Sequence, residues 1–354
     1  MSAATTNIAI SEVPVMDRAE ISRMSSVDVI VPCYRYGHFL RECIESVLVQ
    51  TGVEVRALII DDASPDNSGE VGEELSREDE RVSCVRHAVN KGHIVTYNEG
   101  IEWATADYYI LLSADDYLLP GALDRSARLM DAHPGVGLSY GRAITRMEGE
   151  AAHPAPTPGD GWRVLTGPEF IRMSGAKNIV PTPTAVVRTE LQKRLGGYRV
   201  ELPHSGDMEM WLRLAAHGDV GMLDEYQAVY RLHAANMSSH YYASQYLPDL
   251  RQRKAAADCF LDTCGDVLPD AAQMHRSLIE QLAKETVGFA SSAFNASELD
   301  LSRQLSEFAR ELDPAVTRSG RWMKLVCKRC VGPGVWNTMR SPVQWMRRRV
   351  GQER

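Results

Sequence analysis

Long hydrophobic runs are missing from this 354-residue sequence. It contains no stretch of about 18 uncharged apolar residues, so we predict no transmembrane helix. The opening segment, MSAATTNIAISEVPVMDRAE, lacks a basic segment followed by an apolar core, which argues against a secretory signal. We therefore expect residues 1–25 to be a flexible lead-in of a cytoplasmic protein.

Cysteines are few and irregularly spaced. There are seven of them, an odd number, which argues against a disulfide framework and favours a reducing compartment such as the cytosol. Cys327 and Cys330 have the CxxC spacing of zinc ligands, but no second close pair accompanies them. Two ordinary cysteines are therefore the favoured interpretation.

Positive charge is scarce outside the C-terminal segment. The whole chain carries −8, and residues 315–354 carry +9 from ten Lys/Arg and Glu353, which leaves −17 for residues 1–314. A body this acidic is not expected to bind nucleic acid, because it would not neutralise phosphates. The basic segment also holds three of the six tryptophans. It fits either an anionic membrane surface, at the inner face of the membrane, or a helix packed on the acidic body.

Short apolar runs alternate with helical patterns along the first part of the chain. We expect strands at 27–34, 55–62, 81–87, 107–116 and 136–143. We expect helices along the apolar stripe from Leu40 to Leu48, near 68–77, after a turn within 90–104, and near 120–132. This alternation predicts an α/β fold with a mostly parallel, Rossmann-like sheet covered by helices on both faces. Residues 241–314 are rich in Ala, Leu and alternating charge, which predicts a helical appendage before the basic tail, 315–354.

Polar residues follow three of the expected strands. They are Pro32-Cys33-Tyr34, Asp61-Asp62 and Asp115-Asp116. Ligands bind outside the carboxyl ends of parallel strands, so we expect these three segments to converge on one crevice. The first Asp pair alone also fits a turn. The second is followed by apolar YLLPG, and adjacent carboxylates repel unless a cation or hydrogen-bond donors offset them, which favours a metal site.

Four ordered segments carry a family resemblance: VIVPCYRYGHFLRECIESVLVQT, LIIDDASPDNS, NKGHIVTYNEGI and YILLSADDYLLPGAL. Together they resemble the family 2 glycosyltransferases, inverting enzymes of the GT-A fold, over roughly residues 26–240. The resemblance implies metal-dependent transfer of a sugar from a nucleotide-sugar donor to a hydroxyl. It leaves the acceptor open among glycans, lipid-linked saccharides and other hydroxyl compounds, including those of cell-surface or exopolysaccharide synthesis.

The resemblance also implies a donor nucleotide site. The matching residues that would hold the base and ribose are Pro32, Tyr34, Asp61 and Asp62. A carboxylate that accepts the uracil N3–H would favour a UDP-sugar. The family often has an arginine where this chain has Tyr97, and Lys91 is either the replacement positive charge or a solvated turn lysine.

For the metal and diphosphate, SADD matches the Asp-x-Asp element of the family. It implies a Mn or Mg ion with Asp116 as the main ligand, because hard divalent cations prefer oxygen. Asp115 would share the metal or face the ribose or sugar. In YRLHAANMS, His233 would complete the metal shell or contact the diphosphate, and Arg231 would neutralise phosphate.

For the acceptor side, HSGDMEMWLRLAAHGDVG resembles the segment that carries the general base, which implies this role for Asp207. Gly206 stands where the family usually has an acid. The alternative for Asp207 is a helix N-cap. Glu209 would contact the acceptor or support Asp207, and Trp211 fits the core or an acceptor wall. NIVPTPTAVVR, residues 178–188, matches the region that lines the acceptor pocket.

Two other functions compete with catalysis of glycosyl transfer. A catalytically inactive relative that serves as a binding or scaffold subunit would explain Gly206 and the missing arginine. A sugar nucleotidyltransferase would need a Gly-rich loop with a following Arg and Lys after the first strand, and the sequence has none there.

Overall fold

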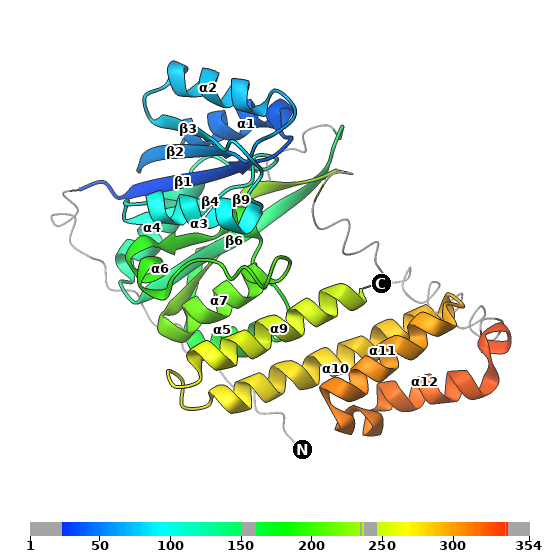
Figure 1. Cartoon of the computed structure of the whole chain (residues 1–354). Helices are drawn as coiled ribbons and strands as arrows, with labels where there is room; N and C mark the ends of the chain where they lie inside the picture. The colour runs from blue at the N-terminus through cyan, green and yellow to red at the C-terminus, as the bar shows by residue number, and fades with distance from the viewer. Residues whose placement is uncertain (1–22, 151–160, 234–235, 237–245, 337, 339–354) are drawn as a thin grey trace, which may run out of the picture.

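The computed structural model describes residues 23–150, 161–233, 236, 246–336 and 338. Most of the expected lead-in, 1–25, therefore lies outside the described residues, and so does the end of the basic tail, 339–354. Figure 1 shows a twisted sheet flanked by helices, with a group of long helices that extends from one side of it.

One half of the sheet is parallel. It consists of β1 (Ser26–Cys33), β2 (Glu54–Asp61), β3 (Val82–Arg86) and β4 (Tyr108–Leu111) in the order β3-β2-β1-β4. β1 pairs in parallel with both β2 and β4, and β2 pairs in parallel with β3. These are four of the five strands that the apolar runs predict, in parallel alignment as expected; the fifth corresponds to β6 (Val136–Met147).

The other half is mixed. It contains β5 (Tyr117–Leu118), β6 (Val136–Met147), β7 (Trp162–Leu165), β8 (Val186–Arg188) and β9 (Asp219–Leu232). β6 and β9 pair in parallel along most of their length, whereas β5, β7 and β8 pair antiparallel with their neighbours. The sequence did not predict these three short strands, because two to four residues are too few for a periodic signal.

Helices cover both faces of the sheet. They are α1 (Gly37–Leu48), α2 (Ser68–Glu78), α3 (His93–Trp103), α4 (Ala122–Ala132), α5 (Gly167–Ser174), α6 (Thr189–Leu195) and α7 (Gly206–His217). Successive β1 residues point to opposite faces: Val29 and Val31 join the core under α1 and α4, and Ile30 joins the core under α3 and α7. Both faces are buried, which explains why the strand reads as a continuous apolar run.

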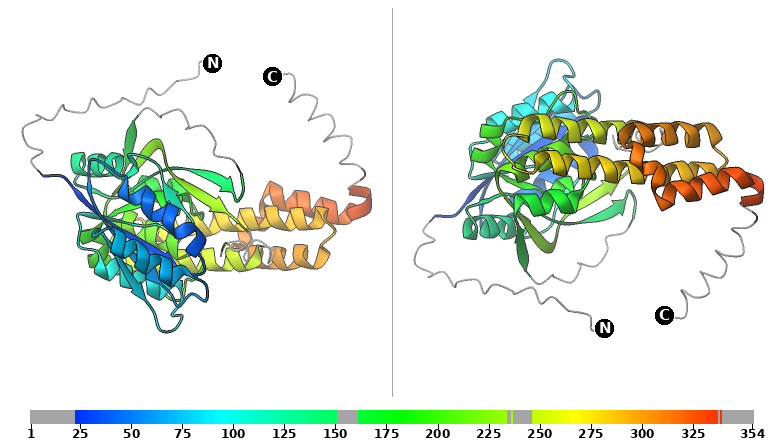
Figure 2. Two further views of the ribbon diagram at one scale, coloured as in Figure 1. Left: turned by 90° about the horizontal axis from the view of Figure 1, so that it is seen from above. Right: turned by 90° about the horizontal axis from the view of Figure 1, so that it is seen from below.

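Four further helices form the C-terminal extension. They are α9 (Leu247–Cys264), α10 (Ala271–Asn295), α11 (Leu299–Leu312) and α12 (Gly320–Val331). Leu250, Phe260 and Leu282 belong to the same buried cluster as α7, so the extension shares its core with the sheet domain. Figure 2 shows the helices projecting sideways, with α12 remote from the sheet. Within the described part of the chain, no helix is long and apolar enough to cross a membrane.

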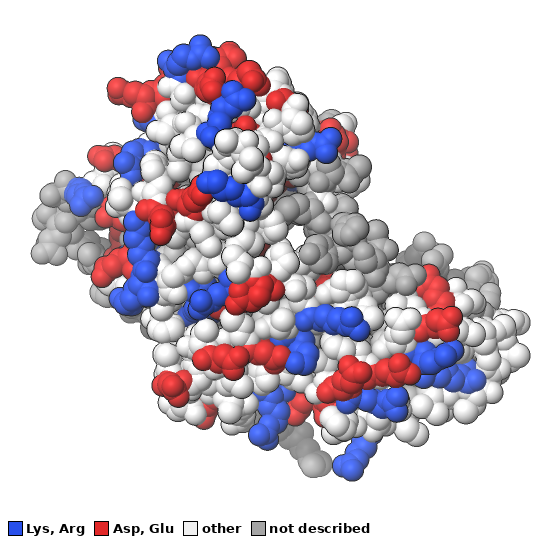
Figure 3. Space-filling view, viewed as in Figure 1, with Lys and Arg blue, Asp and Glu red and all other residues white. Residues whose placement is uncertain are grey.

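Charged side chains are interspersed over the face of the molecule that Figure 3 shows. Acidic and basic groups alternate over the sheet domain and the long helices. The tip of the extension, at the right of the view, is largely uncharged. On this face, the net negative charge of the body is therefore spread out and not gathered in one patch.

Candidate active site

The three predicted strand ends meet at one edge of the sheet. The Asp62 N–H donates to the Cys33 carbonyl at 2.9 Å, which ties the end of β2 to the end of β1. The Ala114 N–H donates to the Pro32 carbonyl at 3.3 Å, which ties the segment after β4 to the same place. Parallel strands that run side by side bring their carboxyl ends together, and the predicted convergence is confirmed.

Asp62 holds the turn that precedes α3. Its Oδ1 accepts the Lys91 N–H at 2.7 Å, and its Oδ2 accepts the Gly92 N–H at 2.9 Å. Gly92 has φ +84°, a left-handed conformation that glycine adopts without strain. Burial opposes ionisation of Asp62, but its hydrogen bonds with His87, Lys91 and Gly92 lower the pKa below the ordinary value. Asp62 therefore remains an ionised acceptor at neutral pH.

His87 is a site residue that the sequence did not reveal. Its Nδ1 lies 2.8 Å from Asp62 Oδ1, and its Nε2 lies 2.6 Å from Glu99 Oε2. The same Glu99 accepts a hydrogen bond from the Lys91 ammonium at 2.7 Å. The Lys91 side chain is thus paired with Glu99 and is neither a free positive charge nor simply solvated.

The other predicted nucleotide residues differ in exposure. Pro32 and Asp61 are buried, and Asp61 accepts the Ser64 N–H at 3.3 Å. Arg86 lies 3.8 Å from the Asp61 carboxylate. Tyr34 is 42% exposed, so its ring has a surface open to a ligand. Of these residues, Tyr34 and the carboxylate of Asp62 offer groups that suit a base or ribose.

Asp115 and Asp116 are both buried at the start of the connection from β4 to β5. Asp115 Oδ2 lies 3.0 Å from His233 Nε2, whereas Asp115 Oδ1 is buried without a hydrogen-bond partner among the described residues. Asp116 Oδ1 accepts the Arg231 N–H at 2.9 Å. Burial raises the pKa of Asp116 well above its usual range, and the neighbouring Asp115 charge raises it further. Like charges buried side by side repel each other, so a cation, hydrogen-bond donors or a proton must offset them.

His233 and Asn236 close one side of the Asp pair. β5 pairs antiparallel with β9, and the chain that leaves β9 reaches Asp115 directly. The Asn236 amide donates to Asp115 Oδ2 at 3.2 Å, a contact that the sequence did not predict. The ring of Tyr36 meets the His233 ring edge-on, with centroids 5.3 Å apart. His233 therefore lies in the site, where its Nε2 is hydrogen-bonded to Asp115.

Arg231 is placed differently from the prediction. Its guanidinium lies over the rings of Phe39 and Tyr117, at 4.7 and 4.8 Å from the centroids, and forms an ion pair with Glu42. The side chain is buried and paired with a carboxylate, so it does not stand free to neutralise a phosphate. Its contribution to the site is the backbone N–H that binds Asp116.

Asp207 lies in the first turn of α7, and the residue as a whole is partly exposed. Ser205 occupies the N-cap position, so the alternative interpretation of Asp207 as the N-cap is wrong. Asp207 Oδ2 accepts a hydrogen bond from Thr182 Oγ1 at 2.9 Å, and Tyr198 is a second hydrogen-bonding partner. Burial raises the pKa of Asp207 above its ordinary value, and these two hydrogen bonds counteract part of the rise.

Tyr97 interacts electrostatically with both carboxylate centres, Asp207 and Asp115. Burial raises the pKa of its phenol, and the negative charges of Asp207 and Asp115 raise it further, in that order. The Tyr97 ring meets the Tyr198 ring edge-on at 5.4 Å. A Cβ at Gly206 would lie 3.1 Å from Tyr198 Cδ1, so a glycine at this position leaves room for the ring that hydrogen-bonds Asp207.

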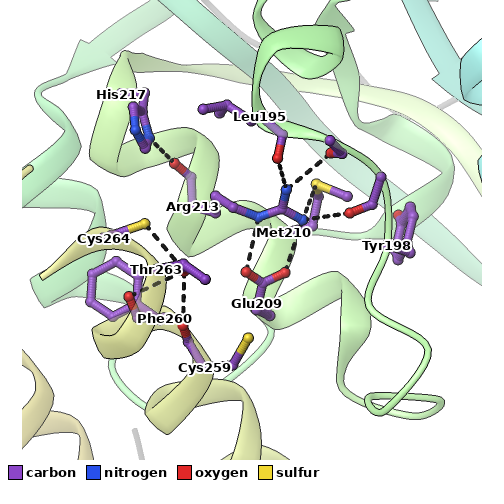
Figure 4. A network of polar contacts seen from close by, with 12 residues as sticks. Leu195, Tyr198, Glu209, Met210, Arg213, His217, Cys259, Phe260, Thr263 and Cys264 are labelled. Carbon is purple, nitrogen blue, oxygen red and sulfur yellow. Dashed lines mark hydrogen bonds and ion pairs between the residues drawn. The ribbon is translucent and has the colours of Figure 1, made fainter.

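The Glu209 side chain is available neither to an acceptor nor to Asp207, the two roles expected for it. Its side chain is fully buried, and both carboxylate oxygens bind Arg213, at 2.9 and 3.0 Å. Arg213 also donates to the backbone carbonyls of Leu195 and the two glycines that follow it (Figure 4). The predicted acceptor contact of Glu209 is therefore wrong, because the pair holds the turn after α6 against α7. Of the two interpretations of Trp211, a core residue or an acceptor wall, the structure supports the core residue.

Parts of this chain are similar to known glycosyltransferases. Residues 28–191 match the model of the family described as Glycosyl transferase family 2. The chain is 33% identical over 154 residues to the uncharacterized glycosyltransferase YibD of Escherichia coli (strain K12), which covers 42% of this chain and 44% of that protein. The alignment thus spans less than half of that relative.

Two solved structures share the fold. S. aureus TarS 1-349 in complex with UDP-GlcNAc has a TM-score of 0.52 and 16% identity, over 81% of this chain and 92% of that one. The mannosyltransferase PcManGT from Pyrobaculum calidifontis in complex with GDP-Man and Mn²⁺ has a TM-score of 0.50 and 16% identity, over 90% and 89% of the chains.

The sheet topology and these two structures show that the chain has the GT-A fold. Residues 28–191 match glycosyl transferase family 2, and YibD, which is similar to part of this chain, carries the name glycosyltransferase. The fold expected from the sequence is thus confirmed, and the family match lies within the region that carries the resemblance. They leave the donor, the metal, the acceptor and the stereochemistry to be argued from the site.

Proposed function

We propose that the protein transfers a sugar from a UDP-sugar to an acceptor hydroxyl, with inversion at the anomeric carbon and with the help of Mn or Mg. The observation that carries the proposal is that two carboxylate centres lie close to the same buried side chain, Tyr97. Tyr97 lies within electrostatic reach of both Asp115 and Asp207. One centre suits the diphosphate side of a donor, and the other suits an acceptor hydroxyl.

The nucleotide is proposed to lie at the ends of β1 and β2. The ionised Asp62 carboxylate has acceptor capacity beyond the two N–H groups and the His87 ring that it binds, because two carboxylate oxygens offer about four lone-pair directions. A uracil N3–H is a donor that fits such an acceptor. The exposed ring of Tyr34 offers a stacking surface beside it.

The residues around Asp115 and Asp116 fit a divalent cation. The described residues contain no group of three His, Cys, Asp or Glu arranged for a metal, so the protein would contribute two carboxylates. Mg²⁺ commonly binds one or two carboxylates together with substrate phosphates. The buried, unpartnered Asp115 Oδ1 suits this role. A bound cation would neutralise the charge that develops on the departing diphosphate.

Asp207 is proposed to act as the general base. In the step, the acceptor oxygen bonds to the anomeric carbon, the bond from that carbon to the UDP oxygen breaks, and the acceptor proton moves to an Asp207 oxygen. Burial raises the pKa of Asp207, which makes it a stronger base than an exposed aspartate. Thr182 and Tyr198 are the two hydrogen-bonding partners that would hold the carboxylate in place for this proton transfer.

The arrangement of the chain follows from these assignments. We propose a catalytic domain at 26–240, a helical extension at 241–314 and a basic tail at 315–354. The segment 178–188, which contains Thr182, would line the acceptor side, as the family resemblance implies. An acceptor from cell-surface or exopolysaccharide glycan synthesis is the expectation that the resemblance adds.

The experiment that tests this function is metal-dependent release of UDP. A panel of nucleotide sugars is first screened by thermal shift with and without Mn, because a ligand at a hundred times its Kd stabilises a fold by about 2.7 kcal/mol. The donor with the largest shift is then assayed for slow hydrolysis. Release of UDP that requires metal and is lost in Asp207→Asn supports the proposal. An absence of both donor binding and hydrolysis would favour the scaffold alternative.

A further inference from the structure

Three of the four basic residues of helix α12 form hydrogen bonds with α10 and α11. Its sequence, GRWMKLVCKRCV, has four cations and no acid. Arg321 Nη1 donates to the Lys284 carbonyl at 3.2 Å. Lys328 is buried and donates to Ser291 and to Asn295, the latter at 3.0 Å. Three polar anchors therefore hold this face of the helix on α10 and α11, the third being Arg329, which binds Ser302 and Ser306.

The opposite face of α12 is apolar and exposed. We define the outer stripe as Met323, Val326, Cys327, Cys330 and Val331. These residues are three, four, seven and eight positions from Met323, so they share one side of the helix. Met323 is 54% exposed and Val331 is 41% exposed. Leu325 is buried and Trp322 packs on the same core, so α12 also has an ordinary apolar inner side. A surface helix ordinarily presents polar side chains to solvent, so a second apolar face on the outer side of α12 is unusual.

We propose that the outer stripe of α12 contacts an anionic lipid bilayer. The charge of the surrounding segment fits such a surface, because residues 315–354 carry +9 and the remainder of the chain carries −17. Each Lys or Arg near an anionic membrane strengthens binding, whereas the acidic body is repelled by it. The stripe would insert its apolar side chains while Lys324, which is exposed beside it, meets the headgroups.

The dimensions of the stripe favour a bilayer over a second copy of the chain. The stripe spans nine residues of helix, and the eight steps between its ends make it about 12 Å long at 1.5 Å per residue. A stable protein interface buries about 800 Å² per partner, far more than five small and medium side chains provide. Interfacial helices need no matching shape in their partner, and few apolar side chains suffice when cationic residues add attraction. Figures 1 and 2 show α12 remote from the sheet, so its contact with a membrane does not require the body to approach the lipid.

Vesicle flotation with the full chain tests this proposal. The probes are vesicles of phosphatidylcholine alone and of phosphatidylcholine mixed with phosphatidylglycerol. The stripe variant carries Met323→Gln, Val326→Gln and Val331→Gln. The matched control carries Val49→Gln, Val89→Gln and Val200→Gln, which are exposed apolar positions on the sheet domain. Substitutions at exposed positions leave folding stability almost unchanged, which thermal unfolding of both variants checks.

We expect the wild-type chain and the control to float with the anionic vesicles and not with the neutral ones, and added salt to weaken the binding. The stripe variant should bind about tenfold more weakly or worse. Equal binding of the stripe variant and the wild type would overturn the proposal, as would no binding to either vesicle. A lipid-free dimer that the stripe variant abolishes would instead make the stripe a self-association surface. None of these readouts depends on glycosyl transfer, so the outcome is independent of the proposed function.

Discussion

Thr182 Oγ1 donates a hydrogen bond to Asp207 Oδ2 at 2.9 Å, across the gap between the short helix before β8 and the first turn of α7. This bond, together with the hydrogen bond to Tyr198, fixes the orientation of the carboxylate. It also lowers the pKa of Asp207 against the rise that burial causes. A residue on one segment thus sets both the direction and the basicity of the proposed base on another.

Replacement of Thr182 by valine removes this hydrogen bond at nearly constant volume. We expect Thr182→Val to lower kcat by roughly 10–100-fold, since misplacement of a reacting group is costly, while donor Kd stays unchanged. The acid limb of the pH–rate profile should move to higher pH, because a stabiliser of the ionised carboxylate is gone. Thr182→Ser keeps the hydroxyl and should restore most of the activity. A valine variant with normal kcat would exclude the positioning role.

Replacement of Asp207 by asparagine removes the ability to accept a proton while the Thr182 hydroxyl keeps an acceptor oxygen. General-base loss typically costs about 10²–10⁴ in rate, and we expect kcat of Asp207→Asn to fall by that order. Donor affinity, measured by titration of the same preparation, should stay close to wild type. Loss of donor binding in a folded variant would move Asp207 to the donor side.

The raised pKa of Asp207 also predicts how the stability of this variant, relative to the wild type, changes with pH. Burial raises the folded-state pKa of Asp207 above 3.8, so ionisation costs stability as pH rises from 3.8 through that raised value. Asparagine does not ionise. We therefore expect Asp207→Asn to melt above the wild type at neutral pH, with a gain that disappears in acid. Thermal unfolding at several pH values measures this gain as the Tm of the variant minus the Tm of the wild type. A difference that is smaller at neutral pH than in acid would contradict the prediction.

Substitution of Asp116, one of the two proposed metal ligands, tests the metal dependence of UDP binding. In Asp116→Asn the amide oxygen still accepts the Arg231 N–H, so the fold should be preserved. We expect metal-dependent UDP binding and transfer to be abolished, because a neutral amide replaces an anionic ligand. Calorimetric titration of UDP with Mn, with Mg and with chelator measures the effect. The exposed Asp300→Asn serves as the control of equal charge change. Wild-type metal dependence in Asp116→Asn would remove this residue from the metal site.

The sequence predicted the parallel strands and the carboxylates at their ends because both are local features. The approach of His233 to Asp115 depends instead on β5, a two-residue strand that pairs with β9 more than a hundred residues later. No periodic pattern marks so short a strand. Asn236 went unnoticed for the same reason, although it stands in the segment that held His233.

Glu209 illustrates a different failure. An acid two residues after Asp207 looks like a companion of it, but two positions along a helix differ by roughly 200° in direction. The two carboxylates consequently face different surroundings, one partly exposed and one in the core. The sequence did contain the signal for the real partner, because Arg213 stands four positions after Glu209, the spacing of a helical ion pair.

Variants of Asp62 and Lys91 test whether UDP binding depends on the Asp62 carboxylate or on the Lys91 side chain. The hydrogen bond between them uses the Lys91 N–H, which remains in Lys91→Ala. We expect Lys91→Ala to change UDP affinity by no more than a few-fold, since its ammonium binds Glu99 at the surface and exposed pairs contribute about 1 kcal/mol or less. Asp62→Ala should weaken UDP binding by 1–2 orders of magnitude, roughly the loss of a charged hydrogen bond.

Metal dependence of the residual activity distinguishes the two halves of the donor site. It should persist in Asp62→Ala, because the carboxylates of the metal site are untouched. Unchanged UDP affinity in this variant would leave Asp62 as a residue that only shapes the turn at Gly92.

The last prediction concerns Glu209 and Arg213, which are 0% and 2% exposed by side chain. Removal of one partner leaves the other charge buried without compensation, which costs about 3–5 kcal/mol. Glu209→Ala should therefore lower Tm markedly and loosen the turn after α6, whose carbonyls bind the same guanidinium. The double variant Glu209→Met with Arg213→Met should be more stable than either single variant, because it removes both charges and refills the space. A contact with the acceptor would give the opposite pattern, with normal unfolding and an increased acceptor KM in Glu209→Ala. Denaturant unfolding of the three variants and the wild type decides between the two.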